Sequence, residues 1–146
     1  MNQCIAKAVS IVRTSPELDD EAMYGRFVSC GMTRQLAAQL VEFLPMAYVR
    51  VLLENSGVRF PDCYERKLPG GVLEKRPLSS EPVWNAALEF ASVEAASGVS
   101  KKDFMALAMR SAEFQAANKL LNGGSKLSDI GFTPCLLLWP EEGPEL

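Results

Sequence analysis

The chain has 146 residues, of which 48% are hydrophobic, and this length and composition suit one folded domain. Its 15 basic and 18 acidic residues give a net charge of −3, which argues against non-specific nucleic-acid binding, because such binding depends on cations that neutralise phosphates. Histidine is absent, which excludes Ser-His and Cys-His catalytic pairs and most zinc and iron sites.

The N-terminal segment and the cysteine content favour the cytoplasm. Residues 1–13 have neither a basic start nor a continuous apolar run, so we expect no secretion signal. The longest strongly apolar run is Cys135–Trp139, and we therefore expect no segment that spans a membrane. The four cysteines are far apart in the sequence and form no C-x-x-C pair, so we expect reduced thiols and neither disulfides nor a metal cluster.

Hydrophobic periodicity and capping residues predict five helices, or six if Pro45 breaks the third. Ser15 and Pro16 are typical of a helix start, and Thr33 and Ser100 are typical N-caps of two later helices. The predicted helices cover residues 3–13, 16–30, 34–55, 82–97 and 101–121.

Residues 57–80 interrupt this helical pattern with a polar stretch that is punctuated by proline and glycine. A connector of this length is usually functional, unless it contains structure of its own. Two extended runs, Cys63–Leu68 and Val72–Arg76, flank Pro69-Gly70-Gly71, which is a pattern typical of a β-hairpin.

Charge complementarity supports the hairpin but leaves its register open. A three-residue loop places Arg66 opposite Glu74, whereas a two-residue loop places Lys67 opposite Glu74. In either register Glu65 also faces a basic residue, and opposite charges across two strands stabilise the pairing by roughly 0.2–1 kcal/mol.

An isolated two-stranded hairpin is marginally stable in water, so it needs a further contact. The candidates for contact with the helical body are the apolar residues Phe60, Tyr64, Leu68 and Leu73. The run Cys135–Trp139, which lies between two prolines, is a candidate third strand.

The predicted fold is therefore mainly α, a single helical domain over residues 1–146 with a hairpin or loop inserted at residues 57–80 and an acidic, frayed tail at residues 141–146. A short C-terminal strand against the hairpin completes the prediction.

Two further patterns have ordinary explanations. The acidic residues at positions 17–21 fit the positive end of a helix dipole better than a cation site. Residues 30–37 resemble a helix-turn-helix, but in the second helix Arg34 is followed by six uncharged residues. A DNA-reading helix needs basic residues, so we favour helix packing.

Basic and aromatic residues gather in the hairpin segment. From Gly57 to Ser80 there are five basic and three acidic residues, a local net charge of +2 within an acidic chain. Arginine and tyrosine are favoured at interfaces, so we predict a partner-binding surface, with a purely structural hairpin as the alternative. The predicted binding residues are Arg59, Asp62, Tyr64, Glu65, Arg66, Lys67, Glu74, Lys75 and Arg76.

We therefore expect a non-enzymatic protein that binds another protein in the bacterial cytoplasm, without a cofactor or a metal. The chain is short, acidic and mainly helical and lacks a catalytic set, and in these respects it resembles small bacterial immunity and accessory proteins. That resemblance implies a toxin-neutralising immunity or accessory protein, whose partner is a toxin or a secretion component. A homodimer is a further option, whereas we expect neither membrane nor nucleic-acid binding.

A small enzyme or ligand-binding domain is the alternative function. Arg50 and Glu54 lie at i,i+4 spacing on one predicted helix, and Arg110 and Glu113 lie on another. On neighbouring helices these four side chains would line a polar cleft that binds an anion or a small molecule. Surface ion pairs, which contribute little to stability, explain the same residues more simply.

Overall fold

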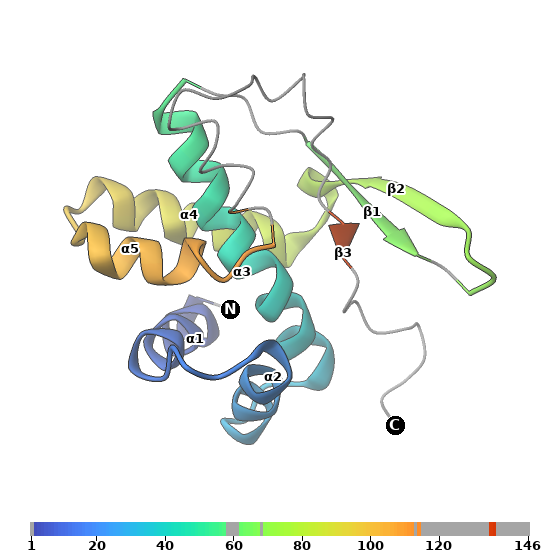
Figure 1. Ribbon diagram of the computed structural model, residues 1–146, viewed down its shortest axis with the longest axis horizontal. Coiled ribbons are helices and arrows are strands. Elements are labelled where there is room, and N and C mark those ends of the chain that lie inside the picture. The colour runs from blue at the N-terminus through green and yellow to red at the C-terminus, as the bar shows by residue number, and fades with distance from the viewer. Residues whose placement is uncertain (1, 58–61, 68, 113, 115–134, 137–146) are drawn as a thin grey trace.

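The computed structural model describes residues 2–57, 62–67, 69–112, 114 and 135–136, and the structural statements below concern these residues. They form a mainly helical fold with a small sheet at one side, which confirms the predicted fold class (Figure 1). The elements are α1 (Asn2–Thr14), α2 (Asp20–Ser29), α3 (Arg34–Asn55), β1 (Cys63–Lys67), β2 (Leu73–Pro77), α4 (Pro82–Ala96), α5 (Lys101–Ala108) and β3 (Cys135–Leu136), with a 3₁₀ turn at Leu78–Ser80 before α4.

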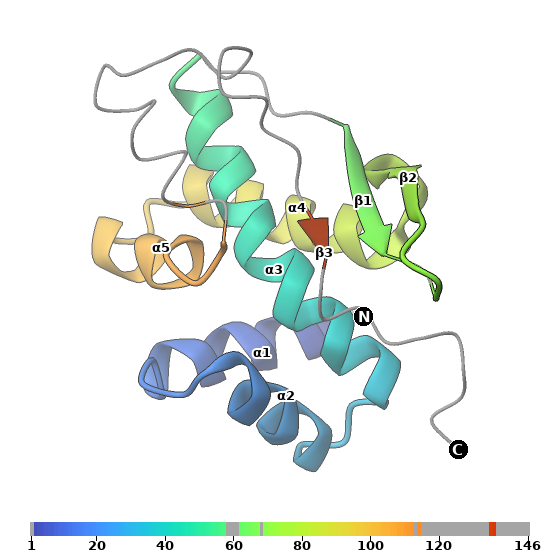
Figure 2. The same ribbon diagram turned by 45° about the vertical axis from the view of Figure 1, so that its right-hand side comes forward.

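The helix α3 forms the centre of the helical body and packs against α1, α2, α4 and α5 (Figures 1 and 2). Fourteen of its 22 residues are buried. Its length and composition are those of a membrane span, contrary to our expectation from the sequence, but 72% of its most apolar window is buried inside the protein. The core helix of a soluble protein has the same properties, so α3 gives no independent sign of a membrane.

Two predicted N-caps are confirmed. The Thr33 hydroxyl accepts a hydrogen bond from the backbone N–H of Leu36 at 3.1 Å. The Ser100 hydroxyl accepts one from the backbone N–H of Asp103 at 3.1 Å. Each cap satisfies a backbone donor that has no partner within its helix, which stabilises the start of α3 and α5 by about 1 kcal/mol.

The start of α2 differs from the prediction. The helix begins at Asp20 rather than Pro16, because the Asp19 carboxylate caps it by accepting a backbone N–H at 2.8 Å. The carbonyls of Pro16 and Leu18 instead accept hydrogen bonds from the guanidinium of Arg110. This arginine is distant in the sequence, so local capping patterns could not reveal the contact.

Pro45 was expected to kink or break the third helix, and the break is absent, since α3 continues through Pro45 as one helix. A proline inside a helix costs about 3 kcal/mol, because it removes a backbone hydrogen bond and its ring clashes with the preceding turn. Pro45 lies between two fully buried residues, Leu44 and Met46. Complete burial of such side chains stabilises a fold by roughly 1.5–3 kcal/mol each, which offsets the cost of the proline.

The hairpin has the register of the three-residue loop. Arg66 lies opposite Glu74, and Glu65 lies opposite Lys75, so the two-residue alternative is excluded. Gly70 and Gly71 in the loop have φ values of +90° and +82°, a conformation that glycine adopts at little cost. In the views of Figures 1 and 2 the loop points away from the helices.

The predicted C-terminal strand is present at two positions. β3 pairs in parallel with β1, with Cys135 opposite Glu65, and the sheet order is β2-β1-β3. Residues 137–139 of the predicted strand and the tail at residues 141–146 lie outside the described part of the chain. Residue 113 and residues 115–121 of the predicted fifth helix also lie outside it.

Candidate functional site

Tyr64 anchors one face of the hairpin in the protein core. Its side chain is 0% exposed, and its ring lies 5.8 Å from the ring of Phe43 on α3 in an edge-to-face arrangement. Phe43 also contacts Trp84 on α4, at 5.9 Å between ring centroids. These three aromatic side chains therefore join the hairpin, α3 and α4, and edge-to-face contacts of this kind add about 0.5–1.5 kcal/mol beyond burial.

A polar contact completes this anchor. The Tyr64 hydroxyl donates a hydrogen bond to Oε2 of Glu81, which precedes α4 and is only 9% exposed. The Arg76 guanidinium lies 4.0 Å from the same Oε2 atom, and its Nε donates to Glu74 at 2.6 Å. Tyr64, Glu74 and Arg76 share a face of the hairpin, which we call the inner face, and their polar groups are satisfied within the molecule.

The base of the hairpin is closed by Asp62. Its carboxylate accepts hydrogen bonds from the backbone N–H of Ser79 at 3.2 Å and from the Ser79 hydroxyl at 3.0 Å. Its backbone carbonyl accepts the N–H of Leu78 at 3.2 Å. Asp62 therefore holds the two strand ends together and has a structural role.

The opposite side of the hairpin faces solvent. Side chains alternate along β2, so that Leu73, Lys75 and Pro77 are exposed, while the intervening Glu74 and Arg76 are partly buried. We call the face that carries Glu65, Leu73, Lys75 and Pro77 the outer face. Leu73 is 56% exposed, and Val72, at the end of the exposed loop, is 60% exposed.

The structure divides the predicted binding residues between these two faces. Glu65 and Lys75 lie on the outer face. Tyr64 belongs to the core, so its predicted contact with the helical body is confirmed and its place among the surface residues is corrected. Glu74 and Arg76 lie on the inner face, paired with each other, and Asp62 closes the base. The remaining positions are Arg59, which lies outside the described residues, and Arg66 and Lys67, whose backbone belongs to β1.

Sequence reasoning missed the contribution of Val72 and Leu73 to the exposed surface. Leu73 was one of four candidates for contact with the helical body, and this candidate is wrong, because Leu73 is 56% exposed and lies on the face opposite to Tyr64. The alternation of side chains along a strand could have shown that Leu73 is exposed. Once Tyr64 is chosen as the anchor and the loop has three residues, the odd-numbered residues of both strands face outward.

Three of the four residues predicted for the alternative cleft, Arg50, Glu54 and Arg110, are described, and Arg110 does not pair with the other two. Arg50 and Glu54 form an ion pair along α3, at 3.3 Å between Nε and Oε2, and the Arg50 guanidinium lies 6.0 Å from the ring centroid of Trp84. The geometry of the pair is not that of a hydrogen bond, so Nε is buried without one. Arg110 has separate partners in the connection between α1 and α2, and Glu113 lies outside the described residues.

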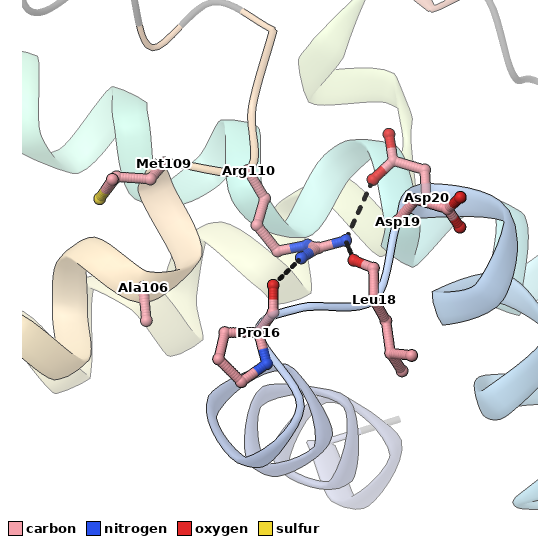
Figure 3. A pocket seen from close by; sticks show the side chains of 7 residues that line it. All are labelled: Pro16, Leu18, Asp19, Asp20, Ala106, Met109 and Arg110. Atoms are coloured by element: carbon pink, nitrogen blue, oxygen red, sulfur yellow. Dashed lines mark hydrogen bonds and ion pairs between the residues drawn. The ribbon is translucent and has the colours of Figure 1, made fainter.

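Arg110 does line a pocket of about 530 Å³, between the α1–α2 connection and α5 (Figure 3). Its Nη2 atom donates to the carbonyl of Leu18 at 2.6 Å and to the Asp20 carboxylate at 3.3 Å, and Nη1 donates to the carbonyl of Pro16 at 3.3 Å. These bonds hold the connection against α5. The guanidinium is thus engaged by the protein, which assigns it a structural role.

The most connected charged cluster joins four helices. Arg13 on α1 forms two hydrogen bonds with the Glu94 carboxylate on α4, at 3.0 and 2.7 Å, and its Nε donates to the carbonyl of Asp103 on α5. The Tyr48 hydroxyl on α3 donates to the same carboxylate at 2.5 Å. The cluster joins the helices on one side of the body, and the Arg13 and Glu94 side chains are 20% and 19% exposed.

The electrostatics of this cluster favour its charged form. Burial alone would raise the pKa of Glu94, but hydrogen bonds from Arg13 and Tyr48 outweigh it and lower the pKa below its ordinary value. Burial, and then the bond to Glu94, raises the pKa of Tyr48 above its ordinary value. Glu94 is therefore held ionised and Tyr48 protonated. These are the states in which Glu94 pairs with Arg13 and accepts a hydrogen bond from Tyr48.

Comparison with known proteins identifies no relative. No protein-family model matches the chain, no curated protein matches its sequence, and no solved structure matches it. The class of protein therefore rests on its own residues: a mainly helical fold that presents one face of an anchored hairpin.

Proposed function

We propose that this chain is a non-enzymatic interaction protein that binds another protein through the outer face and the loop of its hairpin. The observation that carries the proposal is the contrast between the two faces. The inner face is bound to the core by Tyr64, while Val72 and Leu73 are more than half exposed beside the charged residue Lys75.

The anchored inner face favours binding on physical grounds. Association costs free energy when side chains and loops must become ordered at the interface, and a surface that is already held in place reduces that cost. The aromatic contacts of Tyr64 and its bond to Glu81 fix the hairpin on the helical body. The exposed apolar side chains next to a cation provide the mixture of contacts that interfaces use.

The concrete form of this proposal is a toxin-neutralising immunity or accessory protein of the bacterial cytoplasm. The small size, the acidic composition and the helical fold support it, as does the absence of histidine. The partner would be a toxin or a secretion component, bound without a cofactor.

Site-specific crosslinking tests the proposal. A photoreactive amino acid replaces Val72 in the producing cells, and a second strain carries it at Glu89, an exposed position on α4. We expect one protein to crosslink from Val72 and not from Glu89. After purification, that protein should bind the Lys75→Glu variant at least about tenfold more weakly than the Lys101→Glu control, which makes the same charge change at an exposed site on α5.

Equal crosslinking from both positions, or equal affinity of both charge variants, would contradict the proposal. Deleting the hairpin would be an inferior test, because the deletion removes Tyr64 from the core and unfolding would imitate a loss of binding.

A further inference from the structure

The backbone of β2 has two edges, and the pairing of β2 with β1 determines which backbone groups point to each edge. The N–H of Leu78 donates to the carbonyl of Asp62, so these opposite residues form a hydrogen-bonded pair. In an antiparallel ladder hydrogen-bonded and non-hydrogen-bonded pairs alternate. The backbone groups of Arg76 and Glu74 therefore point toward β1, and those of Leu73 and Lys75 point to the other edge.

The position of β3, on the other side of β1 from β2, agrees with this assignment of the backbone groups. Glu65, whose backbone groups point away from β2 in the same pattern, lies opposite Cys135 in β3. The proline at the end of β2 also agrees, because Pro77 has no N–H and lies at an outward position, where none is needed for the hairpin. In the described part of the chain, the sheet ends at β2 on this side.

The outer edge of β2 thus presents the N–H and carbonyl groups of Leu73 and Lys75 together with exposed side chains of the same two residues. An edge of this kind is a template for another extended segment. Lys75 stands between Glu65 on β1 and this edge, so a carboxylate on an added strand would continue an alternation of acid, base and acid across the outer face.

We propose that the β2 edge binds an extended segment of the partner protein as an additional strand, with an acidic residue opposite Lys75 and an apolar residue opposite Leu73. This inference rests on the proposed function and defines the chemistry of the partner. The acidic and apolar residues are two positions apart, because alternate side chains of a strand share a face.

A second copy of this chain fits the edge less well. Two β2 strands related by a two-fold axis at Lys75 would place Lys75 opposite its own copy, and like charges directly opposite each other destabilise a pair of strands. The edge itself is short and ends at Pro77, which limits the number of backbone hydrogen bonds with either occupant. Charge therefore favours an acidic segment of another protein.

Synthetic peptides test the inference on the full chain. The probe is a peptide that repeats Asp-Thr-Val-Thr, in which aspartate and valine are two positions apart and therefore share a face, and its control has lysine in place of aspartate. We expect the acidic peptide to shift the NMR signals of the Leu73 and Lys75 amides and to bind at least about tenfold more tightly than the basic one. Equal affinity of the two peptides would overturn the inference.

Two protein variants separate backbone pairing from charge. Lys75→Ala removes the side chain alone, whereas Lys75→Pro also removes the outward N–H, which the hairpin does not use. We expect Lys75→Pro to bind the acidic peptide at least about threefold more weakly than Lys75→Ala, the effect of one lost hydrogen bond. Equal affinity would contradict strand addition.

Modified peptides keep the test decisive if Lys75→Pro does not fold. An acidic peptide that is N-methylated at alternate residues cannot pair along one edge, and we expect it to lose binding to the unchanged protein.

Sedimentation tests the alternative occupant, a second copy of the chain. A wild-type dimer that the Lys75→Pro substitution dissociates would show a second copy at the edge and overturn the acidic partner. If the peptides fail while crosslinking from Val72 succeeds, the proposed function stands and strand addition is wrong.

Discussion

The two ends of α4 make the same kind of contact with different consequences. At each end a fully buried tyrosine donates to a glutamate: Tyr48 to Glu94 in the last turns, and Tyr64 to Glu81 just before the helix. Glu94 also receives two bonds from Arg13. At Glu81 the nearest guanidinium is 4.0 Å away, because it is bonded to Glu74 of its own strand.

The difference shows how the protein joins its helices tightly at Glu94 and attaches the hairpin at Glu81 by one face only. The contact at Glu94 joins three helices, because the carboxylate binds both Arg13 and Tyr48. The contact at Glu81 holds only the inner face of the hairpin and leaves the outer face exposed. A protein can present a surface in this way without weakening its core.

The largest expected effect comes from removing the shared carboxylate of the helical cluster. Glu94→Ala should lower the free energy of unfolding by about 3 kcal/mol, because it leaves Arg13 and the buried Tyr48 hydroxyl without their partner. Urea denaturation measures this loss. Glu89→Ala, at an exposed position of the same helix, should change stability by less than about 0.5 kcal/mol. Similar losses for Glu94→Ala and Glu89→Ala would show that the cluster around Glu94 does not stabilise the fold.

The two hydroxyl deletions sharpen the comparison. Tyr64→Phe should cost about 2 kcal/mol, since it leaves the nearly buried Glu81 without its hydrogen-bond donor, whereas Tyr48→Phe should cost about 1 kcal/mol, because Arg13 still binds Glu94. Thermal and chemical denaturation of the two variants give the difference. A larger loss for Tyr48→Phe would reverse the proposed order of the two contacts.

Acid should weaken the helical cluster. The folded protein holds the pKa of Glu94 below its ordinary value of 4.5, so the ionised carboxylate stabilises the fold above that pH. This stabilisation is lost as the pH falls through the folded-state pKa. Between about pH 5 and about pH 3, the unfolding free energy of the wild type should therefore decrease more steeply than that of Glu94→Gln. Parallel curves would show that Glu94 does not contribute.

The smallest effect on stability is expected at the exposed surface. Leu73→Asp should change the unfolding free energy by less than about 0.5 kcal/mol, because the side chain is already more than half exposed. The same substitution should disrupt binding of the crosslinked partner. A stability loss as large as that of Tyr64→Phe would mean that Leu73 contacts the body after all.

Local sequence patterns predicted the elements that depend on neighbouring residues. The caps at Thr33 and Ser100 and the hairpin around Gly70 and Gly71 follow from preferences that act within a few positions. The charges left two registers open, since both paired opposite signs, and only the structure selects the one with Arg66 opposite Glu74.

The errors came from contacts between distant residues. Arg110 binds the carbonyls of Pro16 and Leu18 in the segment that was expected to be helical, and the continuity of α3 depends on the burial that surrounds Pro45. The candidate surface was predicted from residue type, which could not separate the two faces of the hairpin. Tyr64 is a typical interface residue and also a typical anchor, and its burial against Phe43 decides between these roles.

Amide hydrogen exchange tests the central claim, a hairpin bound on its inner side and open along its outer edge. The N–H groups of Glu74 and Arg76 point toward β1, so their exchange should be slowed by about a hundredfold or more. The N–H groups of Leu73 and Lys75 should exchange at rates close to those of an unstructured chain. Protection of Lys75 together with rapid exchange at Arg76 would reverse the assignment of the two edges and contradict the account.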